Sequence, residues 1–245
     1  MEFRDVLYLA IGSPQKKRDV WKRHLKRVGL RHGFYIYQDH VVWKDQPFFK
    51  EALKRTQDVE GIPDPRSFVL QSSLRSLANV EGDLAECGVR QGRSTLFMLT
   101  ADLRKRDYHL FDSFEGLSKP GKDDRDAQGR LRWEKGDLRT DEALTRKNLA
   151  GFDNVHFHVG WIPDTLGAVA DRRFAFVHID VDLYEPTRGA LEFFYERTNR
   201  NGLIVCDDYG SAKCPGARKA FDEFFANRPE GVIELPTGQA LVFKQ

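Results

Sequence analysis

Short apolar runs alternate with stretches of helical periodicity from about residue 66 to the C-terminus. Residues 66–78 carry Phe68, Leu70, Leu74 and Leu77 at the spacing of one helical face. Strand-length runs follow at 83–87, 108–111, 155–159, 174–179 and 203–206. The later runs are nearly all apolar, which is typical of strands buried on both faces of a sheet. Their alternation with helices predicts a parallel sheet with right-handed crossovers.

The C-terminal end departs from this alternation. Residues 232–235 and 239–244 have the pattern of two strands, and Pro236, Thr237 and Gly238 between them form a tight turn. Strands joined so closely run antiparallel. We therefore expect an α/β fold whose doubly wound sheet is mostly parallel and ends in an antiparallel hairpin.

The N-terminal segment has a different character. Residues 16–28 have apolar side chains at Val20, Trp21, Leu25 and Val28, which form a narrow helical stripe opposite a strongly basic face. One interpretation is a solvated helix that covers the main domain. Alternatives are a surface that attracts an anionic substrate, or contact with a membrane or nucleic acid.

Pro63 and Pro65 interrupt the chain after an aromatic-rich stretch at residues 33–49. That stretch suits a cap or a subunit contact, so a homo-oligomer is an open alternative. We divide the chain into residues 1–62, a cap, lid or subunit-contact segment, and residues 63–245, the main domain.

Composition narrows the class of protein. The chain has 245 residues, 40% of them apolar, and a net charge of +2, so nothing demands nucleic acid as a partner. Its 3 cysteines are far apart, which argues against a disulfide framework or a structural zinc site. The start does not read as a signal peptide, and no run is long enough to cross a membrane. We expect a cytoplasmic protein that binds neither membrane nor nucleic acid.

A glycine-bearing turn follows the first strand and opens a helix. It reads E-x-G-x-x-x-G-x-S, with Glu86, Gly88, Gly92 and Ser94 at the defined positions. The spacing is neither that of the dinucleotide fingerprint nor that of a P-loop. An acid at the strand end disfavours pyrophosphate and suits a ligand with a cationic amine, such as the methionine part of S-adenosylmethionine.

Asp112 ends the next strand, at about the interval from Gly88 where an acid binds ribose hydroxyls in nucleotide-binding folds. Strand-terminal acids are also common as helix caps. Together, the turn and Asp112 favour an adenosyl ligand.

Four aspartates end two later strands. Asp180 and Asp182 follow one strand, and Asp207 and Asp208 follow the next. In a doubly wound sheet these ends are neighbours at the edge where ligands bind. Neither segment contains an arginine to offset the charge, so a hard divalent cation is indicated: Mg²⁺, or alternatively Mn²⁺ or Ca²⁺. The structural alternative is that these acids cap the helices that follow.

Five motifs together resemble the macrocin O-methyltransferase (TylF-like) family. They lie at residues 80–89, 111–117, 160–166, 178–187 and 207–210 and read VEGDLAECGV, FDSFEGL, GWIPDTL, HIDVDLYEPT and DDYG. The resemblance runs from about residue 62 to the C-terminus. It implies a class I methyltransferase fold, and methyl transfer from S-adenosylmethionine to a hydroxyl on a sugar of a natural product or glycoconjugate.

The resemblance also implies roles for individual residues. Asp180, Asp207 and Asp208 would ligate the metal, and Asp182 would be the general base. The other expected positions line the cofactor: Glu86, Gly88, Gly92 and Ser94 toward the methionine, Asp112 and Ser113 at the ribose, Gly160 and Trp161 near the adenine, and Asp180. The polar loop at residues 119–136, which reads as mobile, and the N-terminal segment would cover the acceptor.

Two positions depart from the family pattern. Position 90 is arginine where the family commonly has tryptophan, and position 93 is also arginine.

Two other functions compete with methyl transfer. A metal-dependent hydrolase could use the same acids but leaves the turn and Asp112 unexplained. A non-catalytic S-adenosylmethionine-binding protein is disfavoured by the four intact aspartates. We interpret His156, His158 and His178 as core or supporting side chains rather than metal ligands.

Overall fold

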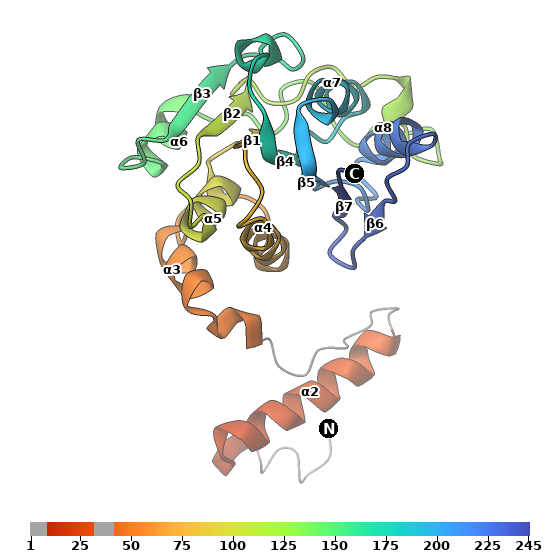
Figure 1. Ribbon diagram of the computed structural model, residues 1–245. Coiled ribbons are helices and arrows are strands. Elements are labelled where there is room, and N and C mark those ends of the chain that lie inside the picture. Colours follow the sequence, from red (N-terminus) through yellow and green to blue (C-terminus); the bar gives the residue numbers. More distant parts are fainter. Residues whose placement is uncertain (1–8, 32–41) are drawn as a thin grey trace. The chain divides into compact units, whose positions relative to one another are not determined.

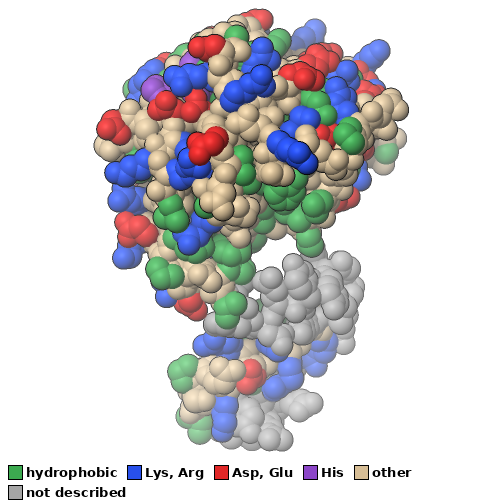
Figure 2. Space-filling model, viewed as in Figure 1, with side chains coloured by type: hydrophobic (Ala, Val, Ile, Leu, Met, Phe, Trp, Pro, Cys, Tyr) green, Lys and Arg blue, Asp and Glu red, His purple; other side chains and the backbone are tan. Residues whose placement is uncertain are grey.

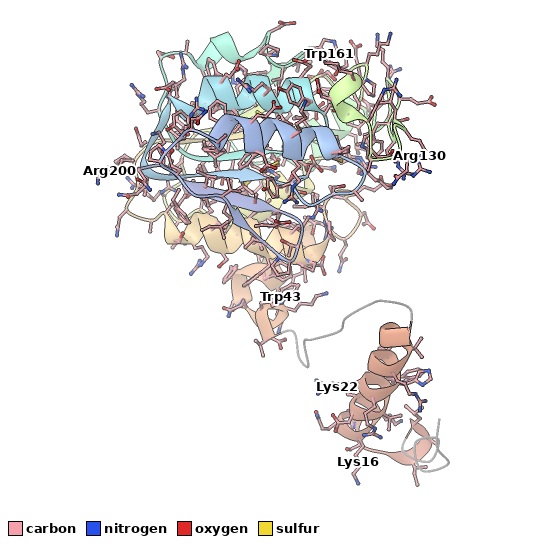
Figure 3. All side chains as sticks on the ribbon, turned by 90° about the vertical axis from the view of Figure 1, so that its right-hand side faces the viewer. Lys16, Lys22, Trp43, Arg130, Trp161 and Arg200 are labelled. Carbon is pink, nitrogen blue, oxygen red and sulfur yellow. The ribbon has the colours of Figure 1, made fainter. Side chains whose placement is uncertain are left out.

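The computed structural model describes residues 9–31 and 42–245, and the chain forms two compact units, Met1–Gln46 and Pro47–Gln245. In the smaller unit, α2 spans Pro14–Arg31, which confirms the helix expected over residues 16–28. Lys16 and Lys22 project from α2 (Figure 3). Trp21 and Leu25 on this helix are 51% and 50% exposed. Within the described ranges, no helix is both long and apolar enough to cross a membrane.

A short 3₁₀ helix, η1 (Val42–Asp45), precedes the boundary between the units. Residues 33–41 of the aromatic-rich stretch lie outside the described residues. Residues 47–62, which we assigned to the N-terminal segment, belong to the larger unit. The role of the N-terminal segment as a cap, lid or subunit contact stays a prediction.

The larger unit is a seven-stranded sheet with helices on both faces (Figure 1). Its helices are α3 (Pro47–Arg55), α4 (Asp64–Ser76), α5 (Arg93–Ala101), α6 (Glu142–Asn148), α7 (Tyr184–Tyr195) and α8 (Pro215–Phe225), with 3₁₀ helices η2 (Lys122–Asp124) and η3 (Leu166–Val169). Its strands are β1 (Asp83–Cys87), β2 (Tyr108–Asp112), β3 (Val155–Val159), β4 (Phe174–Ile179), β5 (Thr198–Cys206), β6 (Ile233–Glu234) and β7 (Ala240–Phe243).

The strand order is β3-β2-β1-β4-β5-β7-β6. The pairs among β1 to β5 are parallel, whereas β7 runs antiparallel to both β5 and β6. This order confirms the doubly wound sheet with a C-terminal antiparallel hairpin. The order reverses between β1 and β4, so the carboxyl ends of these strands flank the crevice where such sheets bind ligands.

Two apolar clusters fill the two sides of the sheet, because successive side chains of a strand point to opposite faces. On β5, Leu203 and Val205 pack with α4 and α5, whereas Ile204 and Cys206 pack with α7 and α8. Charged side chains remain outside. Lys and Arg intermingle with Asp and Glu on the face of the larger unit in Figure 2.

Arg93, the first residue of α5, connects this helix to the segment before β1. Its guanidinium donates to the carbonyl oxygens of Thr56 at 2.7 Å and Ile62 at 3.1 Å, and pairs with Asp64 at 2.9 Å. Its exposed fraction is only 14%, so these partners satisfy a charge that has left water. The arginine at position 93, a departure from the family pattern, therefore has a structural role.

The loop at residues 119–136 is anchored rather than free. Asp124, buried in η2, accepts a hydrogen bond from the Tyr184 amide at 2.7 Å, and Trp133 packs against the cluster under α7 and α8. Arg130, by contrast, points away from the domain (Figure 3). The expectation of a mobile polar loop missed these anchors because they join residues far apart in sequence.

The loops after β1 and β4 touch through their backbones at Gly88. The Asp180 amide donates to the Cys87 carbonyl at 2.8 Å, and a Cβ added at Gly88 would lie 1.8 Å from the Asp180 carbonyl oxygen. Gly88 also has a φ of +86°, which disfavours other residues. A glycine here is what lets the turn after β1 reach the aspartates after β4.

We predict that Gly88→Ala lowers the free energy of unfolding by more than about 3 kcal/mol, because backbone atoms must separate. Gly129→Ala is the matched control, since Gly129 has a φ of +75° but nothing within 4 Å of an added Cβ. The control should cost only the roughly 1–2 kcal/mol of a left-handed residue. Urea unfolding measures both variants, and equal losses would contradict the close approach.

Candidate active site

A cavity of about 270 Å³ opens at the carboxyl edge of the sheet. Side chains or backbone from the turn after β1, from the ends of β2 and β3 and from the loops after β4 and β5 line it. The expected site residues among its lining are Gly88, Ser94, Asp112, Ser113, Gly160, Trp161, Asp180, Asp182 and Asp207. The fold therefore brings residues from separate motifs into one cavity.

Three expected residues do not line this cavity: Glu86, Gly92 and Asp208. Glu86 is completely buried and is held by the Thr95 hydroxyl and by His178 Nδ1, the latter at 3.0 Å. It therefore lies beneath the turn that was expected to present it to the cofactor. Contact between Glu86 and a cofactor stays a prediction.

Asp112 organises the turn above β1. One carboxylate oxygen accepts hydrogen bonds from the Val89 and Arg90 amides at 2.7 and 2.8 Å, and the other accepts one from Phe114 at 2.7 Å. Three backbone donors thus fix this side chain at the wall of the cavity. Its expected role at a ribose stays a prediction.

Gly160 and Trp161 follow β3 and form another part of the wall. The Gly160 amide donates to the Asp112 carbonyl at 2.9 Å, which ties the end of β3 to the end of β2. Gly160 has a φ of +143°. Trp161, labelled in Figure 3, is half-buried. It lines the cavity, and its expected place near an adenine stays a prediction.

The four aspartates form two groups rather than one. Asp180 and Asp207 lie together with His178, and each pair of their ligand atoms is within 4.8 Å. Asp182 and Asp208 lie in the same way with Cys214. The alternation of β5 separates Asp207 from Asp208, because these adjacent residues continue toward the α4 and α8 sides of the sheet, respectively. Alternation would instead place Asp180 and Asp182 on one side, but Asp182 lies beyond the end of β4 and has left-handed backbone.

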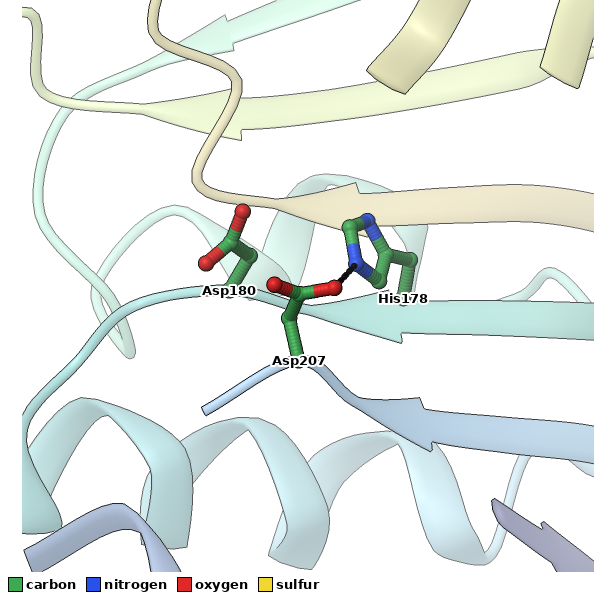
Figure 4. A group of neighbouring side chains, drawn as sticks. All are labelled: His178, Asp180 and Asp207. Atoms are coloured by element: carbon green, nitrogen blue, oxygen red, sulfur yellow. Dashed lines mark hydrogen bonds and ion pairs between the residues drawn. The ribbon is translucent and has the colours of Figure 1, made fainter. Parts of the chain in front are cut away.

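Asp207 has its own counter-charges. Arg66, from α4, approaches one oxygen at 2.6 Å, while Gln239 donates to the other at 2.7 Å. His178 Nε2 lies 3.4 Å from that second oxygen (Figure 4). Burial alone would raise the pKa of Asp207, but the hydrogen bonds and charges of His178 and Arg66 hold it below its ordinary value.

His178 is completely buried between two carboxylates. Burial opposes its charge, but the hydrogen bonds to Asp207 and Glu86 raise its pKa to about 10. Both ring nitrogens therefore donate. The imidazolium links Glu86, which lies beneath the turn after β1, to Asp207. The interpretation of His178 as a supporting side chain rather than a metal ligand stays a prediction. Arg66, which was not expected here, lies 141 positions from its partner.

Asp180 and Asp208 lack the ion pair that Arg66 makes with Asp207. Burial raises the pKa of each well above its usual range, and the neighbouring aspartates add to the shift. Crowded carboxylate oxygens of this kind fit a hard divalent cation. Asp180 and Asp207, with Asp208 from the other group, are the residues that would hold it.

Asp182 lies at the cavity in an unusual conformation. Its φ is +60°, its side chain is 8% exposed, and its amide donates to Asp208 at 2.9 Å. Burial raises the pKa of its carboxyl group. Left-handed backbone at a residue other than glycine is costly and is concentrated at functional sites.

Known proteins match the chain in sequence and fold. It is 36% identical over 149 residues to the 8-demethyl-8-(2,3-dimethoxy-alpha-L-rhamnosyl)-tetracenomycin-C 4'-O-methyltransferase of Streptomyces olivaceus, and the match covers 56% of this chain and 57% of that protein. It is 33% identical over 238 residues to the mycinamicin III 3''-O-methyltransferase of Micromonospora griseorubida, covering 86% and 90%. The structure of the O-methyltransferase NovP superposes with a TM-score of 0.64 at 29% identity, covering 75% of this chain and 81% of NovP.

The chain thus spans little more than half the length of the first of these relatives and most of the second. The family model of the macrocin-O-methyltransferases (TylF) matches residues 66–233, which include the cavity-lining residues from Arg66 to Asp207. The chain belongs to the macrocin-O-methyltransferase (TylF) family.

Proposed function

We propose that this protein transfers a methyl group from S-adenosylmethionine to a hydroxyl of a glycosylated small molecule, with a divalent cation at the aspartates. The observation that carries the proposal is the single cavity shared by the turn after β1 and the aspartates after β4 and β5. Such a cavity can hold donor and acceptor in contact. Relatives named for a rhamnosyl tetracenomycin and for mycinamicin III support a related class of acceptor.

The donor would lie over the turn after β1. Gly88 allows the close backbone approach, Ser94 opens α5, and Asp112, Ser113 and Trp161 form the wall toward the nucleoside. In the reaction, the acceptor oxygen bonds to the methyl carbon as the carbon–sulfur bond breaks. The products are the methyl ether, S-adenosylhomocysteine and one proton.

Asp182 would accept that proton. It lines the cavity, and none of the described residues donates a hydrogen bond to its Oδ2 atom. A raised carboxyl pKa brings the group closer to the range where a general base works best. A cation held by Asp180, Asp207 and Asp208 would lower the pKa of an acceptor hydroxyl.

We expect Asp182→Asn to lower the rate of methyl transfer by about 10²- to 10⁴-fold, because the amide cannot take up the proton. A panel of glycosylated acceptors that begins with mycinamicin III measures the rate, and calorimetry should find nearly unchanged affinity for S-adenosylhomocysteine. Asp171→Asn, at an exposed position, is the control. A variant at residue 182 with near-wild-type rate would remove Asp182 from the role of base.

We expect Asp180→Asn to stabilise the metal-free protein, because it removes a carboxyl group whose ionisation is opposed by burial and by the neighbouring aspartates. It should also abolish stabilisation by Mg²⁺, which for the wild type is about 2.7 kcal/mol at a hundred times the dissociation constant. Thermal unfolding with and without Mg²⁺ measures both effects. If the variant kept the full shift with Mg²⁺, Asp180 would not be a ligand.

A further inference from the structure

The loop at residues 119–136 reaches both sides of Asp182. On one side, the buried Asp124 accepts hydrogen bonds from the Gly121 and Tyr184 amides, each at 2.7 Å. Tyr184 begins α7 directly after the Asp182 turn, so Asp124 supplies an acceptor and a negative charge to the first turn of this helix. The position of Tyr184 limits how far the backbone of Asp182 can move.

The first turn of α8 leaves room for this contact. A Cβ added at Gly216 would lie 2.0 Å from Asp124 Oδ1 and 2.9 Å from the Tyr184 amide nitrogen. The absence of a side chain at Gly216 therefore allows Asp124 to fit between α7 and α8. Lys219, farther along α8, pairs with Asp123 and anchors the same part of the loop.

On the other side, Trp133 reaches Asp182 through Cys214. The Trp133 indole nitrogen donates to the Cys214 sulfur at 3.5 Å, and the Cys214 thiol donates to Asp182 Oδ1 at 3.1 Å. Cys214 is 2% exposed. Because the indole N–H occupies an acceptor position of the sulfur, the thiol hydrogen is free to point to the carboxylate.

These contacts hold a residue that would not adopt its conformation alone. The φ of +60° at Asp182 costs roughly 1–2 kcal/mol relative to ordinary backbone. The Asp182 amide donates to the Asp208 carboxylate, and the Cys214 thiol donates to Asp182 Oδ1. Among the described residues, none donates to the other carboxylate oxygen, Asp182 Oδ2. The side chain thus has one oxygen restrained by a donor and one that is available to accept a proton.

We propose that the 119–136 loop is a positioning element for the base, with Cys214 as the donor that orients the Asp182 carboxylate and Trp133 as the residue that orients Cys214. This inference rests on the proposed role of Asp182. Neither Cys214 nor Trp133 lines the cavity, so both act through Asp182 rather than on the acceptor.

The test measures how fast a carbodiimide and glycine ethyl ester modify the Asp182 carboxyl group in the full chain. Mass spectrometry of the peptides obtained by digestion reads the extent of modification at Asp182. It requires no acceptor. Cys214→Ala should raise the rate at Asp182 several-fold, because the carboxylate loses its restraint, and Trp133→Phe should raise it less. Cys214→Ser keeps a donor of similar size, so it should retain the wild-type rate.

Tyr195→Phe is the matched control. Tyr195 belongs to the same apolar cluster as Cys214, and its hydroxyl donates to Glu230 at 3.0 Å, away from the cavity. The control should lose stability without a change at Asp182. Equal modification of Asp182 in the wild type and Cys214→Ala would overturn the proposal, as would a Cys214→Ser variant that behaves like Cys214→Ala. Failure of the proposed function is a separate outcome, since it is decided by methyl transfer in Asp182→Asn.

Discussion

Buried negative charge at the carboxyl edge of the sheet is the constraint on which the rest of the site depends. Asp182, Asp207 and Asp208 are nearly or completely removed from water, and Asp180 is half-buried beside them. Like charges in such a place are tolerated only with partners. The chain supplies Arg66 and His178 to Asp207, whereas Asp180 and Asp208 keep raised pKa values. The lack of compensation for these two carboxyl groups is the physical reason to propose a cation.

The same constraint connects the two halves of the cavity. His178 lies between Asp207 and Glu86, and Glu86 in turn is held by Thr95 at the start of α5. The helix α5 and the loops after β4 and β5 therefore share one buried chain of hydrogen bonds. Arg66 extends that chain to the C-terminal hairpin through the Thr237 carbonyl at 3.0 Å. A change in any of these residues would therefore disturb both halves of the cavity.

Local patterns predicted the strands and the acids, but not the compensation between them. The runs at 83–87, 155–159 and 174–179 agree with β1, β3 and β4. The pattern is clearest for β4, which is buried at every position, as expected of a parallel strand covered on both faces. Arg66, Cys214 and Asp124 carry no such signature. Their roles arise only when α4, α8 and the 119–136 loop pack around Asp182 and Asp207. The separation of Asp207 from Asp208 follows from strand alternation and could have been predicted from their adjacent positions. The separation of Asp180 from Asp182 could not, because these residues are two apart and Asp182 has left-handed backbone.

The central claim is that one cavity receives S-adenosylmethionine beside a divalent cation. Calorimetric titration of the metal-free protein with S-adenosylmethionine and S-adenosylhomocysteine, each with and without Mg²⁺, tests it most directly. We expect saturable binding of both ligands at one site per chain and a separate heat of Mg²⁺ binding. Absence of binding of either ligand under both conditions would contradict it.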